Sequence, residues 1–102
     1  MDIKGFITEN RQRMLDELFD ILRIPSVSAD PAFAGDVRRC AEAVAASLKS
    51  AGASNVVVIT TPGHPIVFVE YQTSLDAPPE IVSGHYDLLQ PPHLELSDIQ
   101  AF

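Results

Sequence analysis

The sequence contains a single cysteine, Cys40. One cysteine excludes a disulfide within the chain, and this low usage is typical of proteins of the reducing cytosol. No apolar run approaches the roughly 20 residues that a membrane-spanning helix requires. The first five residues, Met1 to Gly5, show no basic segment leading into an apolar stretch, so no signal peptide is visible. These absences predict a cytoplasmic protein with no membrane partner.

Basic residues are also scarce in this chain. It has 7 Lys and Arg against 14 Asp and Glu, which gives a formal net charge of −7. Because nucleic-acid phosphates are bound by clusters of Lys and Arg, we expect no nucleic-acid partner. The length of 102 residues, 46% of them hydrophobic, predicts one domain or part of one, with a modest core.

The first half of the chain carries two helical patterns. Apolar residues at i, i+3, i+4 and i+7 predict a helix from about Gly5 to Leu22, which Pro25 ends. A second apolar stripe predicts a helix that starts between Pro31 and Gly35 and runs to Ala51. Gly52 then stands where a C-terminal cap is expected. Two helices are therefore predicted before any β structure.

The second half predicts strands. The β-branched run Asn55 to Thr61 and the run Ile66 to Tyr71 predict two strands, joined by a Pro-Gly turn and antiparallel to each other. A third strand is predicted at Ile81 to Gly84. The predicted fold class is α/β: two N-terminal helices followed by a short mixed sheet, made of a β-hairpin and a third strand.

The residues with the clearest chemistry follow the third predicted strand. His85 and Asp87 are two positions apart, so in an extended chain they point to the same face, with Tyr86 on the other side. A neutral imidazole is a common zinc ligand, and a nearby carboxylate fixes its tautomer and raises its basicity. The pair lies at the carboxyl end of the strand, where ligands bind in open α/β sheets.

Both residues also have simpler interpretations. On local chemistry alone, a histidine at a strand end is more often a loop residue than a ligand. Asp87 could equally be a turn or helix-capping residue. Structural roles in a turn, a loop or the core are predicted for the other reactive side chains: His64, His93, Cys40, Ser26 and Ser28.

Four segments resemble one known family, in the same order along the chain. Ser83-Gly84-His85-Tyr86-Asp87 with the following Gln90-Pro91-Pro92 resembles the first metal-binding segment of the M20 metallopeptidases, which hold two zinc ions. Leu22 to Ser28, Leu48 to Ala53 and Thr61 to Val67 resemble earlier parts of these enzymes, and the last of these segments is most like the dipeptidase branch. One departure is the run after Asp87, which is one residue longer than usual before Gln90.

The resemblance implies an activity and roles for the pair. It implies zinc-dependent hydrolysis of a dipeptide or a related amide, with His85 as a metal ligand and Asp87 as the active-site carboxylate that supports it. The family's remaining ligands, its general-base Glu and its lid domain correspond to positions beyond Phe102. We therefore expect residues 1–102 to be the N-terminal part of a zinc-peptidase-like catalytic domain, inactive alone, with a homodimer possible only through the missing lid. The alternative is a non-catalytic remnant that binds a partner.

Overall fold

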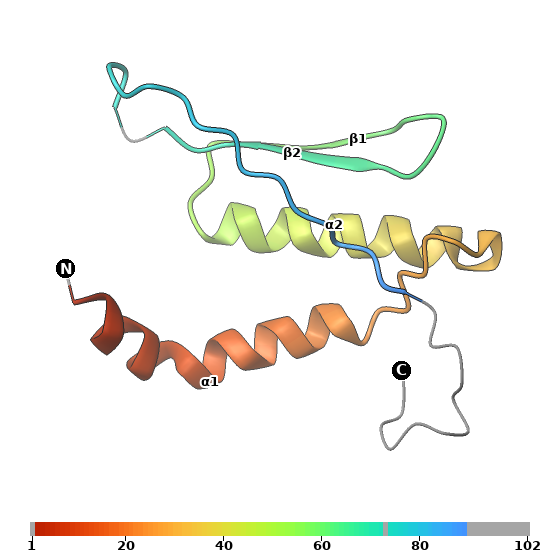
Figure 1. Ribbon diagram of the computed structural model, residues 1–102, viewed down its shortest axis with the longest axis horizontal. Coiled ribbons are helices and arrows are strands. Elements are labelled where there is room, and N and C mark those ends of the chain that lie inside the picture. The colour runs from red at the N-terminus through yellow and green to blue at the C-terminus, as the bar shows by residue number, and fades with distance from the viewer. Residues whose placement is uncertain (1, 73, 90–102) are drawn as a thin grey trace.

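The computed structural model describes residues 2–72 and 74–89 (Figure 1). Its elements follow in the order α1 (Ile3–Leu22), the 3-10 turn η1 (Pro31–Phe33), α2 (Ala34–Ser50), β1 (Asn55–Ile59) and β2 (Ile66–Glu70). The two predicted helices and the predicted hairpin are confirmed, at nearly the predicted positions. The described part of the chain is thus a small mixed α/β unit.

The helix ends are formed by short polar side chains and by glycine. The Asp2 side chain accepts a hydrogen bond from the backbone of Gly5 at 3.1 Å and begins α1. The Asp30 side chain accepts from the backbone of Ala32 at 3.0 Å and begins η1, which leads into α2. Gly52, with a φ of 101°, follows α2 as the predicted left-handed cap. Neither of the described helices is apolar enough over its length to cross a membrane.

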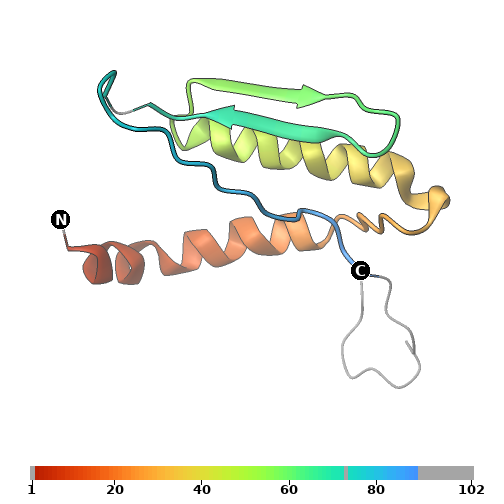
Figure 2. The same ribbon diagram turned by 45° about the horizontal axis from the view of Figure 1, so that its top comes forward.

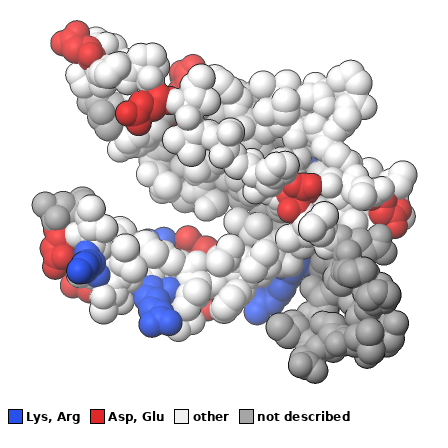
Figure 3. Space-filling model, viewed as in Figure 1, with Lys and Arg blue, Asp and Glu red and all other residues white. Residues whose placement is uncertain are grey.

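Charged side chains lie on the exposed surface of α1. Arg13 and Glu17 form an ion pair at 2.9 Å, and Arg23 and Asp20 form another at 3.1 Å. More than half of each side chain is exposed, so each pair stabilises the helix only slightly. On the face shown in Figure 3, Lys and Arg side chains gather over α1, whereas the surface over α2 and the hairpin is mostly uncharged.

The hairpin packs one of its two faces against α2 (Figure 2). β1 and β2 are antiparallel, with Val57 opposite Phe68 at the centre of the register. Alternate residues are half-buried and exposed along both strands. Because α2 covers one face of the hairpin, the half-buried residues mark that face: Val56, Val58, Val67 and Val69. The opposite face of the sheet remains exposed within the described chain.

The third predicted strand is not formed in the described residues. The segment Ile81 to Gly84 is extended and runs past the hairpin without pairing to it (Figure 1). Ile81 and Val82 are 96% and 92% exposed. Their β-branched side chains favour a strand, but a strand also needs a neighbour for its backbone N–H and C=O groups. Because no described segment supplies that neighbour, the described sheet has two strands, and the predicted mixed sheet is wrong.

The core is small and lies where three segments meet. The residues that are fully buried come from the loop after α1 and from the first half of α2: Ser26, Val27, Val37, Cys40 and Ala41. Leu88 joins them through a parallel bridge to Val27. The prediction that Cys40 is a buried core residue is confirmed. The segment that carries His85 and Asp87 is therefore anchored next to the best-packed part of the molecule.

Candidate functional site

Tertiary hydrogen bonds hold the segment of the predicted site in place. The backbone N–H of Leu88 donates to the carbonyl of Ser26 at 2.9 Å. The carbonyl of Tyr86 accepts from Ser26 Oγ and from Cys40 Sγ, each at 3.4 Å. These bonds tie the segment to the loop after α1 and to α2. The position of the predicted site therefore depends on these contacts rather than on a strand ladder.

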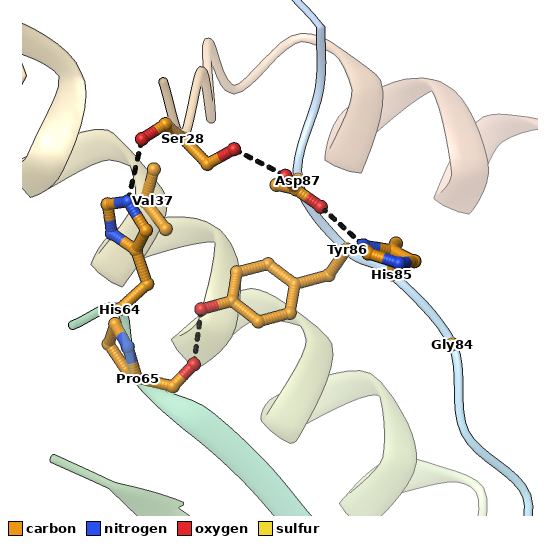
Figure 4. Close-up of a pocket in the computed structure, with 8 residues that line it drawn as sticks. All are labelled: Ser28, Val37, His64, Pro65, Gly84, His85, Tyr86 and Asp87. Atoms are coloured by element: carbon orange, nitrogen blue, oxygen red, sulfur yellow. Dashed lines mark hydrogen bonds and ion pairs between the residues drawn. The ribbon is translucent and has the colours of Figure 1, made fainter. Parts of the chain in front are cut away.

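His85 and Asp87 touch, as their spacing predicts. His85 Nδ1 and Asp87 Oδ1 are 3.1 Å apart, and the two side chains lie on the same side of the chain (Figure 4). The His85 side chain is 94% exposed, whereas that of Asp87 is 30% exposed. The bond uses one ring nitrogen of His85 and leaves Nε2 accessible to a ligand.

Ser28 holds the other oxygen of the Asp87 carboxylate. Its Oγ donates a hydrogen bond to Asp87 Oδ2. This bond, followed by the bond with His85, lowers the pKa of Asp87 below its ordinary value. The carboxylate is therefore charged at neutral pH. A charged partner at Nδ1 favours the imidazole tautomer whose Nε2 carries a lone pair.

The hairpin turn closes the opposite side of the site. His64 Nε2 lies 2.8 Å from the carbonyl oxygen of Ser28, and the Tyr86 hydroxyl donates to the carbonyl of Pro65 at 2.6 Å (Figure 4). Burial raises the pKa of Tyr86, and the nearby Cys40 and Asp87 raise it further. The phenol therefore remains a proton donor over the physiological range.

An open pocket of about 280 Å³ lies among these groups. Its wall combines the loop after α1, the α2 side chain Val37, the hairpin turn and residues 84–87. Polar atoms from Ser28, His64 and Asp87 share this wall with the apolar surface of Val37. The site thus joins four stretches of the chain, from the first loop to residues 84–87.

Three residues that were not predicted to belong to the site contact it in the structure. Ser28 was predicted to bond within its own loop, but its hydroxyl bonds to Asp87, 59 positions away. His64 lies in a turn as predicted, yet its ring reaches the first loop. Tyr86 points away from the pair, and its hydroxyl bonds to the hairpin turn.

Two parts of the sequence prediction concern residues that the structure does not describe. His93 and the run Gln90-Pro91-Pro92 lie outside the described residues. Within the described ranges, no group of three or more His, Cys, Asp or Glu is arranged to hold a metal ion. A catalytic zinc site generally has three protein ligands. His85, backed by Asp87, has the donor chemistry of one such ligand.

Comparisons of the chain with protein-family models, with curated proteins and with solved structures find no match. The class that the structure itself defines is a small mixed α/β unit with two helices and a two-stranded antiparallel sheet. The features of the chain that bear on its function are the pair His85 and Asp87 and the sequence motifs around them.

Proposed function

We propose that this chain is the first metal-binding part of a zinc-dependent amide hydrolase that acts on dipeptides or related small amides. His85 binds zinc through Nε2, and Asp87 supports His85 from behind. One observation carries the proposal: His85 Nδ1 is bonded to Asp87 Oδ1 at 3.1 Å while the rest of the ring is exposed.

This geometry matches what a histidine ligand of zinc needs. Zinc binds the neutral imidazole at a nitrogen without a proton, so the proton must be held on the other nitrogen. Asp87 accepts the Nδ1 proton and is charged at neutral pH, because bonds from Ser28 and His85 lower its pKa. A negative partner at Nδ1 raises the basicity of Nε2 and fixes the orientation of the ring.

The remaining parts of such a catalytic site are supplied by other residues of the complete enzyme. Bound zinc polarises the substrate carbonyl and activates water. The present chain contributes one ligand, its supporting carboxylate and one wall of the pocket. The amide substrate, the second zinc ion and the general base belong to the proposal for the complete enzyme.

A chimera tests this proposal. Residues 1–102 replace the corresponding segment of an active M20 dipeptidase, and zinc per chain and dipeptide turnover are measured on the same preparations. We expect the chimera to bind zinc and to turn over substrate. His85→Ala should remove about one zinc ion and most of the turnover, because a metal ligand is lost.

His93→Ala is the matched control, because it removes the same type of side chain from the same part of the sequence. It should keep both zinc and turnover. A chimera without bound zinc, or a His85→Ala variant that retains zinc and turnover, would overturn the proposal.

The exposed sheet face favours a second candidate function, the binding of a partner without catalysis. This face carries four apolar side chains that are 42% to 54% exposed: Val57, Ile59, Ile66 and Phe68. An apolar surface of this kind is often a site of association. A chimera that folds but is inactive and binds no zinc would favour this candidate over the hydrolase.

A further inference from the structure

We propose that Ser28 is a positioning residue for Asp87. His64 in turn holds Ser28 where its hydroxyl can reach the Asp87 carboxylate. Ser28 and His64 touch neither the reacting atoms nor the metal in this proposal. They act through Asp87 on the tautomer and orientation of His85.

A closed ring of contacts surrounds one side of the pocket (Figure 4). His64 Nε2 bonds to the carbonyl of Ser28 at 2.8 Å, and Ser28 Oγ bonds to Asp87 Oδ2. The hydroxyl of Tyr86, the neighbour of Asp87, bonds to the carbonyl of Pro65 at 2.6 Å. Pro65 follows His64 in the chain, so the ring returns to its starting point. The ring ties the first loop, the hairpin turn and the site segment to one another.

Ser28 matters because of which oxygen it holds. Asp87 Oδ1 faces His85 and Asp87 Oδ2 faces Ser28, so each carboxylate oxygen has its own partner. A carboxylate held at one oxygen can turn about its side-chain bonds, whereas bonds at both oxygens fix its plane. The hydroxyl of Ser28 therefore keeps Oδ1 directed at His85 Nδ1. Supporting contacts of this kind orient metal ligands.

His64 holds the loop that carries Ser28. Its contact with the Ser28 carbonyl requires a proton on Nε2, because a carbonyl oxygen can only accept. Ser26 and Val27 anchor the start of this loop in the core, since both are fully buried. His64 fixes the loop on the far side of Val27, where Ser28 turns toward the site. With Nε2 bonded in this way, His64 acts as a brace on the first loop.

The effect of Ser28 on the tautomer of His85 can be measured at the ring nitrogens of His85. In the ¹⁵N-labelled 102-residue chain at about pH 8, above the ordinary histidine pKa, long-range ¹H–¹⁵N spectra give the ratio of the two neutral tautomers. We expect the Nδ1–H form to dominate in the wild type. Ser28→Ala should lower the ratio of Nδ1–H to Nε2–H several-fold, because Asp87 no longer holds its orientation. Ser28→Thr keeps the hydroxyl and should restore the ratio.

His64 is tested in the same way. His64→Ala should shift the ratio in the same direction as Ser28→Ala, while His64→Gln, whose amide can donate to the Ser28 carbonyl, should shift it less. Ser54→Ala is the control, because Ser54 Oγ bonds to the carbonyl of Glu70 in a different part of the fold. Backbone amide shifts outside the site confirm that each variant keeps the fold.

The effect of Ser28 on zinc binding rests on the proposed function. The chimera distinguishes failure of the hydrolase proposal from failure of the positioning role. In the chimera, Ser28→Ala should weaken zinc binding about tenfold, at the low end of the losses known for such supporting groups. If the wild-type chimera binds no zinc but Ser28→Ala still shifts the tautomer ratio, the hydrolase proposal fails and the positioning role stands. If Ser28→Ala folds normally and leaves both the tautomer ratio and the zinc affinity unchanged, the positioning role is overturned.

Discussion

The side chain of Asp87 makes two contacts with different consequences. The bond from Ser28 contributes most to the low pKa of Asp87, and the bond with His85 contributes next. Only the second bond acts on the candidate metal ligand. A hydroxyl therefore stabilises the charge, and the charge supports the imidazole. In the proposed function, this division of roles would distinguish Asp87 from a simple turn residue.

The role of the Asp87 charge is tested by Asp87→Asn in the chimera. Asparagine has nearly the same shape but lacks the negative charge that supports His85. We expect turnover to fall about 10–100-fold, while most of the metal stays bound at saturating zinc because His85 remains. Zinc per chain and turnover are measured on the same preparation. Unchanged turnover would return Asp87 to the simpler role of a turn residue.

At the scale of elements, the end of α2 depends on one glycine. Gly52 has a φ of 101°, and the N–H of Ala53 bonds back to the carbonyl of Leu48 at 3.2 Å. A residue with a Cβ is strained in this left-handed conformation. This cap directs the chain from α2 into β1, so it sets how the hairpin packs against the helix.

Two glycine substitutions, one just after α2 and one within its first turn, test this cap. Gly52→Ala should lower the free energy of unfolding by about 1 kcal/mol, because alanine is strained at positive φ. Gly35→Ala is the matched control, since a Cβ there meets nothing within 4 Å. Gly35→Ala should raise the free energy of unfolding by about 0.5 kcal/mol through helix propensity. Urea unfolding followed by circular dichroism measures both, and a shift of the same sign in the two variants would contradict this account.

The elements that the sequence predicts well are those with local causes. The apolar spacing of α1, the glycine after α2 and the β-branched residues of the hairpin act within a few positions. The third strand failed because pairing depends on a neighbour elsewhere in the fold, which the exposed Ile81 lacks among the described residues. The contact of His85 with Asp87 was predictable from their spacing. The contact of Ser28 with Asp87 was not, because only the tertiary fold brings them together.

At the scale of the whole molecule, the chain contributes only part of the proposed catalytic site. We expect the purified 102-residue chain to hydrolyse no dipeptide above background, even with added zinc. The described residues include one candidate metal ligand, His85, bonded to Asp87, and no group of three or more His, Cys, Asp or Glu that could hold a metal ion. Turnover is measured with and without a chelator. Zinc-dependent turnover that persists after contaminating peptidases have been removed would contradict this expectation.

Substitutions on the two faces of the hairpin should have opposite effects on self-association and on stability. Val67 is half-buried on the face toward α2, whereas Phe68 is 48% exposed on the outer face. An exposed apolar face favours self-association, so the sedimentation coefficient of the wild type should rise with concentration. Phe68→Lys should weaken that dependence and change the free energy of unfolding by no more than about 0.5 kcal/mol. Val67→Lys should lower the free energy of unfolding by about 2 kcal/mol or more, because it places a charge against α2.

Sedimentation velocity and urea unfolding of the wild type and the two variants check these predictions. A wild type that stays monomeric at all concentrations, or equal destabilisation by the two lysines, would show that the outer face is not the associating surface.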